Sequence, residues 1–314
     1  MRNAPVYRPL VDLATLEERH IIQTYRLNRQ TIMDLVTQLE LELLPAIRHP
    51  SAIPPTVQVL SVLHFLVSGS FQMTVSLAAG MSQPMFSNSL KDVLCALLQH
   101  MASYIRFPHH ADLPTVKAAF YNLALVTHMI GAIYGIHIVL VPPRTSEQVY
   151  SNRKNFYSTN VQVVCQADQY ITQVTVRLPG SVHDSYFLQN STIPHIMAPL
   201  RRYRVCLISM YPYICVPFCS QHTSQLTLHP PGPDMAHTSV HTGDSGYPDL
   251  PWLLTPVRHP TTVAENRYNE AHGSTRRVTE LTIGLLKARF KCLHIFGGAL
   301  LYTPQKVCQI IVAC

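Results

Sequence analysis

Carboxylate side chains are the residues of this sequence with the clearest chemical potential. Asp244 lies in the segment GDSGYP, where a strand would end in a turn, and Glu280 lies in the later segment RRVTELTIGLLKARF. Asp184 stands in PGSVHDSYF, after another glycine turn. Mg²⁺ prefers oxygen ligands, and two such ions spaced about 3.5 to 4 Å stabilise the attacking and leaving oxygens of a phosphodiester. These carboxylates are candidates for metal-dependent phosphodiester cleavage, although a lone carboxylate in such a place is more often a helix cap or part of a surface ion pair.

Basic side chains are the second chemical signal. Between Arg267 and Leu293 the sequence has a helical pattern, and its cations lie largely off an expected apolar stripe of Val278, Leu281, Leu285, Leu286 and Phe290. Such cations bind the phosphates of DNA, although an ordinary solvated face is the alternative. The cations of this pattern that could contact DNA are Arg276, Arg277, Lys287 and Arg289.

The N-terminal part must fold as helices. Apolar residues at three- and four-residue steps predict helices over 17–44, 56–66, 71–79 and 83–104, within a helical region that spans residues 1–110. Gly80 forms a turn and Ser82 can cap the following helix, so 56–104 has the layout of a helix-turn-helix. Lys91 is its main candidate for a DNA contact. Ordinary packing of two helices is the alternative interpretation.

The remainder of the chain predicts a mixed α/β domain. Residues 130–141, 160–165 and 171–178 are rich in β-branched residues and predict strands, a helix can begin at Asp184, and 267–293 is helical. We therefore expect a domain that comprises 115–193 and 243–314. The stretch 194–242 has many prolines and no period of either kind, so we expect an inserted or disordered segment there.

Composition narrows the class of protein. The chain has 314 residues, 47% of them apolar, and a formal charge of +7, which excludes a disordered chain. Its apolar stretches are shorter than the ~18 residues of a membrane helix, so we expect no membrane span. Its 8 cysteines lack paired spacing, which favours reduced thiols inside the cell. A zinc site is the alternative for Cys206, Cys215, Cys219 and His222.

Several blocks carry a family resemblance when they are taken in order. The segments are RLNRQTIMDLV, PPTVQVLSVLHFLVSGSFQ, YSNRKNFYSTNVQVVC, LPGSVHDSYFLQNS, GDSGYPDLPWLLTP, ENRYNEAHGSTRRVTE and GLLKARFKCL. Together they resemble the Harbinger transposase-derived nucleases, which belong to the transposase family of PIF/Harbinger elements. The resemblance runs from about residue 26 to the end of the sequence, with 194–242 excepted.

The resemblance implies a fold and a set of site residues. It implies an RNase H-like nuclease domain of the DDE type, preceded by a helix-turn-helix region, with an Asp, Asp, Glu triad that binds Mg²⁺. Asp244 matches the second Asp and Glu280 the Glu, but Tyr134 in GAIYGIHI stands where the family has its first Asp. A phenol has a pKa of about 10 and replaces a carboxylate poorly. Asp168 or Asp184 could supply a substitute.

The resemblance also implies a biological setting. It implies DNA as the substrate, a Myb-like DNA-binding partner protein, and a location in the nucleus and the cytoplasm. We expect a metal-dependent nuclease whose activity is impaired at Tyr134. The alternative is a non-catalytic remnant of a transposase that binds DNA or another protein.

Overall fold

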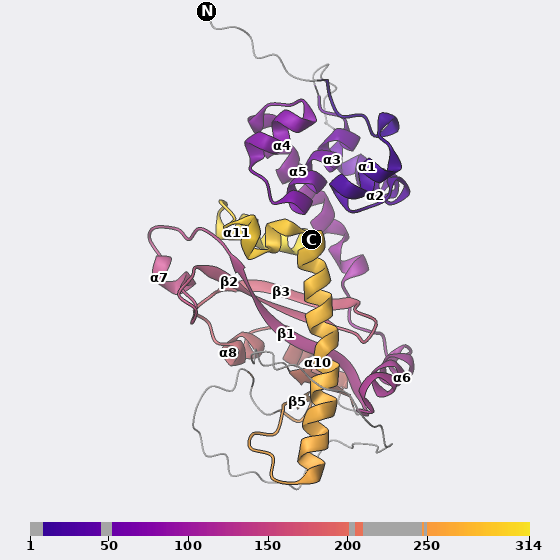
Figure 1. Cartoon of the computed structure of the whole chain (residues 1–314), viewed down its shortest axis with the longest axis vertical. Coiled ribbons are helices and arrows are strands. Elements are labelled where there is room, and N and C mark those ends of the chain that lie inside the picture. Colours follow the sequence, from indigo (N-terminus) through magenta and orange to yellow (C-terminus); the bar gives the residue numbers. More distant parts are fainter. Residues whose placement is uncertain (1–8, 45–51, 201–204, 210–246, 248–249) are drawn as a thin grey trace, which may run out of the picture. The chain divides into compact units, whose positions relative to one another are not determined.

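The computed structural model describes residues 9–44, 52–200, 205–209, 247 and 250–314 (Figure 1). Its contacts define two compact units, and each unit is built from separate stretches of the chain. The first unit comprises Met1–Tyr104, Ile138–Ser146 and Leu285–Cys314, and the second comprises Ile105–His137 and Glu147–Gly284. The sequence predicts one boundary near residue 110, but two later stretches return to the first unit. Within the described residues, no helix is both long enough and apolar enough to cross a bilayer.

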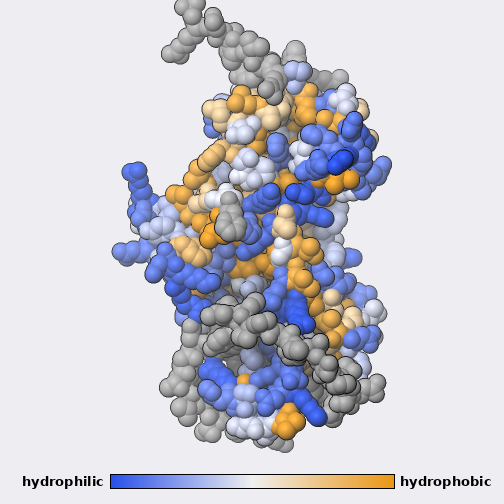
Figure 2. Space-filling model, in the orientation of Figure 1, coloured by the Kyte–Doolittle hydropathy of each residue, from blue (hydrophilic) through white to orange (hydrophobic). Residues whose placement is uncertain are grey.

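The first unit is helical. Its elements are η1 (Leu13–Thr15), α1 (Glu18–Tyr25), α2 (Arg29–Leu43), α3 (Pro55–Ser68), α4 (Gln72–Ala79), α5 (Gln83–Tyr104), η3 (Lys291–Leu293), η4 (Ile295–Gly297) and α11 (Pro304–Ala313). Ten side chains of α3 are buried, so α3 forms the centre of this unit. Apolar side chains remain exposed on and next to α4, among them Phe71 and Leu77, and Figure 2 shows hydrophobic atoms over this helix.

Two helices occupy the stretch 17–44, where the sequence pattern predicts a single one. Arg26 ends α1 with a φ of 57°, in the left-handed region that side chains other than glycine rarely adopt. The side chain of Asn28 then accepts a hydrogen bond of 2.8 Å from the backbone N–H of Thr31 and starts α2. The break was missed because apolar periodicity continues across it.

A glycine turn joins α4 to α5, as predicted. Gly80 has a φ of 77°, and the N–H of Met81 donates to the carbonyl of Ser76 at 3.0 Å, which satisfies the end of α4. The hydroxyl of Ser82 accepts from the N–H of Met85 at 3.4 Å at the start of α5. The turn at Gly80 and the bond to Ser82 follow the prediction, whereas the helix-turn-helix and DNA recognition by α5 stay predictions.

The last thirty residues complete the helical unit. The ring of Tyr302 packs edge-on against Phe65 of α3, with 5.8 Å between the ring centroids, and its hydroxyl accepts a bond of 2.8 Å from Gln72. Thr303 caps α11. Gly69 has a φ of +66° and its backbone lies against that of Lys291, so a side chain at position 69 would be strained and crowded.

The second unit contains a mixed sheet. Its strands are β1 (Met129–Val139, of which the last two residues belong to the first unit), β2 (Ser158–Cys165), β3 (Ile171–Pro179), β4 (Cys206–Ser209) and β5 (Leu253–Leu254). Their order is β3-β2-β1-β4-β5. β2 pairs with β3 in antiparallel register, whereas β4 pairs in parallel with both β1 and β5. The three strands predicted from composition are confirmed.

Two elements lie inside the stretch 194–242 that the sequence assigns to an insert. α9 (Ile193–Leu200) buries Ile193 and Met197, and β4 lies between β1 and β5 in the sheet with Leu207 fully buried. The prediction of an insert is therefore wrong for these residues, while 210–242 lie outside the described residues. A strand of only four residues is too short to show a period, which explains the error.

Helices surround this sheet. They are α6 (Leu113–Ala124), α7 (Glu147–Tyr150), α8 (Asp184–Gln189), α9 and α10 (Val263–Arg289). α6 was not predicted, although Val116, Phe120 and Ala124 recur at four-residue steps and are buried in the core. The same core receives Leu188 from α8 and Val278 from α10.

The buried face of α10 is rich in threonines. Its buried residues are His272, Thr275, Val278, Thr279, Thr282 and Ile283. The expected stripe is therefore wrong, since Leu281 and Leu285 are 57% and 60% exposed. Each buried threonine donates its hydroxyl to a carbonyl of its own helix, at 3.1, 2.9 and 2.7 Å, which leaves its methyl group to pack.

Candidate functional site

Tyr134 is central to the predicted site. It lies in β1 and is half-buried. Burial raises the pKa of its hydroxyl, and the nearby charges of Glu280 and Asp184 raise this pKa further, whereas Arg276 lowers it. The phenol is therefore neutral at physiological pH, and charged groups of α8 and α10 lie near enough to act on it.

Glu280 lies on α10, near enough for its charge to act on the hydroxyl of Tyr134. Its carboxylate forms an ion pair with Arg276, one helical turn earlier, with 2.8 Å between Arg276 Nε and Glu280 Oε1. The Glu280 side chain is 41% exposed, so solvent screens the pair. The carboxylate that the resemblance assigns to a metal thus has a basic partner within the protein.

Neighbouring residues hold the side chain of Asp184 in place next to Tyr134. Its Oδ1 accepts a hydrogen bond of 2.9 Å from Asn160 Nδ2 on β2. Its carboxylate also covers the backbone of Gly135, because a Cβ added to Gly135 would lie 2.9 Å from Asp184 Oδ1. Asp184 therefore rests against β1 one residue after Tyr134.

Tyr247 is the described residue of the GDSGYP segment. It is 1% exposed, and its hydroxyl accepts a hydrogen bond of 3.2 Å from Gln162 Nε2. Burial raises its pKa well above the usual value, and the charge of Asp184 adds to the shift. Asp244, the second predicted metal ligand, precedes Tyr247 by three positions and lies outside the described residues.

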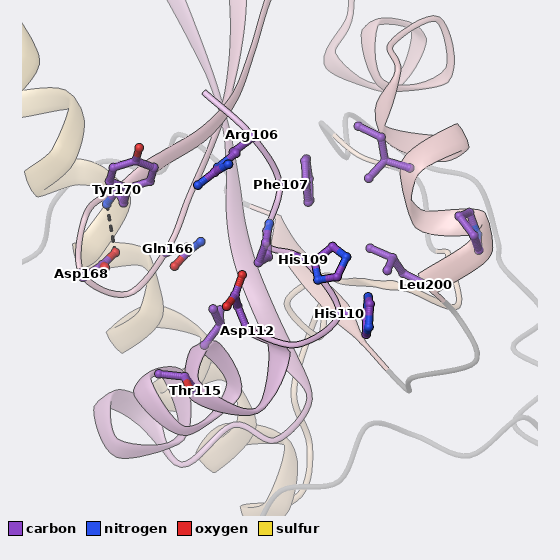
Figure 3. A pocket seen from close by; sticks show the side chains of 14 residues that line it. Arg106, Phe107, His109, His110, Asp112, Thr115, Gln166, Asp168, Tyr170 and Leu200 are labelled. Carbon is purple, nitrogen blue, oxygen red and sulfur yellow. Dashed lines mark hydrogen bonds between the residues drawn. The ribbon is translucent and has the colours of Figure 1, made fainter. Parts of the chain in front are cut away.

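Asp168, the other candidate substitute for the missing carboxylate, is not part of this cluster. It lies exposed in the turn between β2 and β3, where it accepts a hydrogen bond of 3.1 Å from the N–H of Tyr170. It lines an open cavity of about 930 Å³, the one that Figure 3 shows. The polar side chains around that cavity are Arg106, His109, His110, Asp112, Thr115, Gln166, Asp168 and Tyr170.

The predicted DNA contacts differ in their surroundings. Lys91 on α5 and Arg277 and Arg289 on α10 are exposed, and Lys287 is partly exposed. Arg276 is bound to Glu280 and is only 22% exposed, so its guanidinium already has a partner.

The described residues do not form a typical metal site. Among them, no three side chains of His, Cys, Asp or Glu gather around a point where an ion could sit. Cys206, one residue of the alternative zinc cluster, is buried in β4, and the other three lie outside the described residues.

Sequence reasoning missed two residues of this site. Asn160 and Gln162 are both 1% exposed and lie in β2, where they contact Asp184 and Tyr247. Their signal was present, because NVQVVC alternates polar and apolar residues while every position of β2 is buried. A buried polar residue in such a strand needs a partner, which marks a functional position.

Comparisons with known proteins establish the family of this chain. Residues 133–314, from β1 to the end of the chain, match the family described as DDE superfamily endonuclease. The chain is 33% identical over 303 residues to the protein of Rattus norvegicus named "Putative nuclease HARBI1", covering 96% of this chain and 77% of that protein. The same identity and coverage hold for the Homo sapiens protein of that name.

A more distant plant relative also matches. The "Protein ALP1-like" of Arabidopsis thaliana is 23% identical over 260 residues, covering 82% of this chain and 58% of that protein. No solved structure matches significantly. The family match covers more than half of the chain, and the similarity to the animal relatives extends over nearly all of it. The chain therefore belongs to the Harbinger transposase-derived nucleases of the DDE endonuclease superfamily.

Proposed function

We propose that this protein binds DNA and that its metal-dependent phosphodiester cleavage is severely weakened. The observation that carries the proposal is Tyr134, a half-buried phenol beside Glu280, where the family resemblance expects a carboxylate. Three carboxylates can offset the charge of two divalent cations, whereas a phenol with a raised pKa contributes no charge at neutral pH.

The described residues do not fit a two-metal centre. Tyr134 is uncharged, and Glu280 is bound to Arg276. Asp244 and Glu280 are the proposed ligands for the Mg²⁺ binding that is left, and we derive no cleavage step from them. The protein's own residues instead support retention of DNA, because Lys91, Arg277 and Arg289 expose cations that phosphates attract.

We also propose the finer fold that the resemblance implies. The strand order β3-β2-β1-β4-β5, with an antiparallel pair at one end and parallel pairs at the other, supports an RNase H-like domain. The glycine turn between α4 and α5 supports a helix-turn-helix that contacts DNA through Lys91. Nuclear and cytoplasmic location and a Myb-like partner stay predictions from the resemblance.

A cleavage assay with matched variants tests the proposal. The unmodified chain should not cut duplex DNA in the presence of Mg²⁺, and Tyr134→Asp should gain cleavage that Glu280→Gln then removes. Robust cleavage by the unmodified chain, lost on Glu280→Gln, would overturn the assigned role of Tyr134. Absence of cleavage from Tyr134→Asp, with DNA binding intact, would favour the alternative of a non-catalytic binding protein.

DNA binding itself is tested by its salt dependence. Each phosphate contact contributes about −0.9 to the slope of log affinity against log salt, so Arg277→Ala should reduce the slope by about one contact. Arg144→Ala is a matched control, because Arg144 is an exposed arginine outside the predicted DNA-contacting set. Equal effects of both substitutions would show that no particular face binds DNA.

A further inference from the structure

Two buried amide oxygens lie beside Asp184 without a hydrogen-bond donor. They are Asn160 Oδ1 and Gln162 Oε1, and neither has a partner among the described residues. Both residues are 1% exposed, so bulk water does not solvate them. A buried carbonyl oxygen without a partner loses its hydration and gains no hydrogen bond in exchange, so such a group marks a place for a bound water, ion or ligand.

The orientation of the Asn160 amide is fixed by its neighbours. Asn160 Nδ2 donates to Asp184 Oδ1 at 2.9 Å and to the carbonyl of Val182 at 3.2 Å. Rotating the amide by 180° would place its oxygen against two acceptors, which is unfavourable. The oxygen of Asn160 is therefore the atom that lacks a donor.

Gln162 brings its oxygen to the same region. Residues 160 and 162 are two positions apart in β2, so their side chains leave the same face of the sheet. Gln162 Nε2 donates to the hydroxyl of Tyr247, and the charge of Asp184 acts on that hydroxyl. Asn160 and Gln162 are thus tied to Asp184 and Tyr247 by hydrogen bonds, and Asp184 in turn lies against Gly135 of β1.

We propose that Asp184, Asn160 and Gln162 bind one hard divalent cation such as Mg²⁺ or Mn²⁺. Carboxylate and amide oxygens are the ligands these ions prefer, and the ion would supply the partner that both amide oxygens lack. The site stands independently of Asp244 and Glu280 and needs no carboxylate at position 134. The nearby cation of Arg276 forms an ion pair with Glu280.

The charge of this site sets its strength. One carboxylate and two neutral oxygens make a weak site, with a dissociation constant of about 0.1 to 1 mM, at the weak end of protein sites for hard cations. Such a site would place one ion beside Tyr134. The protein would then bind a single divalent cation without forming a two-ion centre.

Terbium luminescence measures this binding directly. Tb³⁺ replaces hard cations and emits when a nearby excited tyrosine transfers energy to it, and Tyr134 and Tyr247 both lie beside Asp184. Titration of the full chain with Tb³⁺ under tyrosine excitation should give a saturable signal that Mn²⁺ displaces. Absence of any saturable signal would overturn the proposal and assign the two oxygens to bound water.

Matched variants locate the ion. Asp184→Asn should weaken Tb³⁺ binding at least tenfold, whereas the exposed control Asp168→Asn should change it less than twofold. Asp244→Asn and Glu280→Gln separate this site from the ligands proposed above. Loss of the signal in those two variants, but not in Asp184→Asn, would place the ion on the family ligands and refute the new site.

A second variant covers the case in which Asp184→Asn fails to fold. Gln162→Met keeps the length of the side chain and removes its oxygen without a change of charge. It should weaken Tb³⁺ binding about threefold to tenfold and leave circular dichroism unchanged. Unaltered affinity in this folded variant, together with unaltered affinity in Asp184→Glu, would exclude the proposed ligand set.

Discussion

The contact between Gly135 and Asp184 allows a quantitative prediction. In Gly135→Ala, the new Cβ would lie 2.9, 3.3 and 3.4 Å from Oδ1, Cγ and Oδ2 of Asp184. Because ordinary contacts are longer, the carboxylate must move by about 0.4 Å or more, which stretches its 2.9 Å hydrogen bond from Asn160. Overpacking costs about 1–3 kcal/mol, and a hydrogen bond to a charged group contributes about 1.5–3 kcal/mol. Alanine regains about 0.5 kcal/mol through lower backbone entropy, so we expect a net loss of about 1–2 kcal/mol.

Urea unfolding and thermal melting measure this change. The expected loss corresponds to a fall in Tm of about 2–8 °C for a unit of this size. In the Asp184→Ala background the obstruction is absent, so Gly135→Ala should be neutral or slightly stabilising. The control is Gly284→Ala on α10, where an added Cβ meets nothing within 4 Å and alanine should stabilise by about 0.5–1 kcal/mol. An equal cost of Gly135→Ala in both backgrounds would refute the packing of Asp184 on β1.

Three further predictions concern charge and thiol chemistry. Arg276→Gln should release Glu280 and strengthen Mg²⁺ binding by the Tyr134→Asp protein about twofold, since an exposed helical ion pair contributes about 0.3–0.5 kcal/mol. Calorimetric titration measures the Mg²⁺ affinity, and an unchanged affinity would show that Glu280 is not a ligand. Burial raises the pKa of Cys165 to about 12 and that of Cys206 to about 11, so the native state keeps both thiols protonated to a higher pH than the unfolded state does. The free energy of unfolding should therefore fall above pH 9, by up to ~1.4 kcal/mol per pH unit for each thiol. Urea unfolding at several pH values should show a shallower decline in Cys165→Ala. In the native protein the exposed Cys95 should react with iodoacetamide long before either buried thiol, and mass spectrometry that found Cys165 labelled first would contradict its burial.

The sequence predicts the elements with strong periods and fails where a period is short or hidden. The strands β1 to β3 and the helix α10 follow from runs of β-branched and helix-forming residues. β4 was missed because a strand of four residues is too short to show an alternating pattern, although it lies between β1 and β5 within the sheet. The buried face of α10 was misassigned because threonine counts as polar, yet Thr275 and Thr282 bond their hydroxyls within the helix and pack their methyl groups.

The candidate site was likewise predictable only in part from the sequence. The proximity of Tyr134 and Glu280 was predictable from the family resemblance, which supplied long-range contacts that no local pattern contains. The role of Asp184 depends on how β1, β2 and α8 pack together, and only the fold reveals it. Asn160 and Gln162 were predictable in part, because a buried amide side chain in a strand requires a hydrogen-bond partner.

The return of residues 285–314 to the first unit affects how the protein folds during synthesis. Tyr302 packs on Phe65 and hydrogen-bonds Gln72, so α3 and α4 meet part of their final surroundings only when the ribosome has reached the end of this segment. Most domains can close as soon as their own stretch has emerged, N-terminal ones first. Here the N-terminal helices must wait through the synthesis of nearly the whole second unit, and their apolar surfaces are open to chaperones during that time. A nascent chain that stops before η3 should therefore be held by chaperones, whereas release should coincide with the appearance of α11.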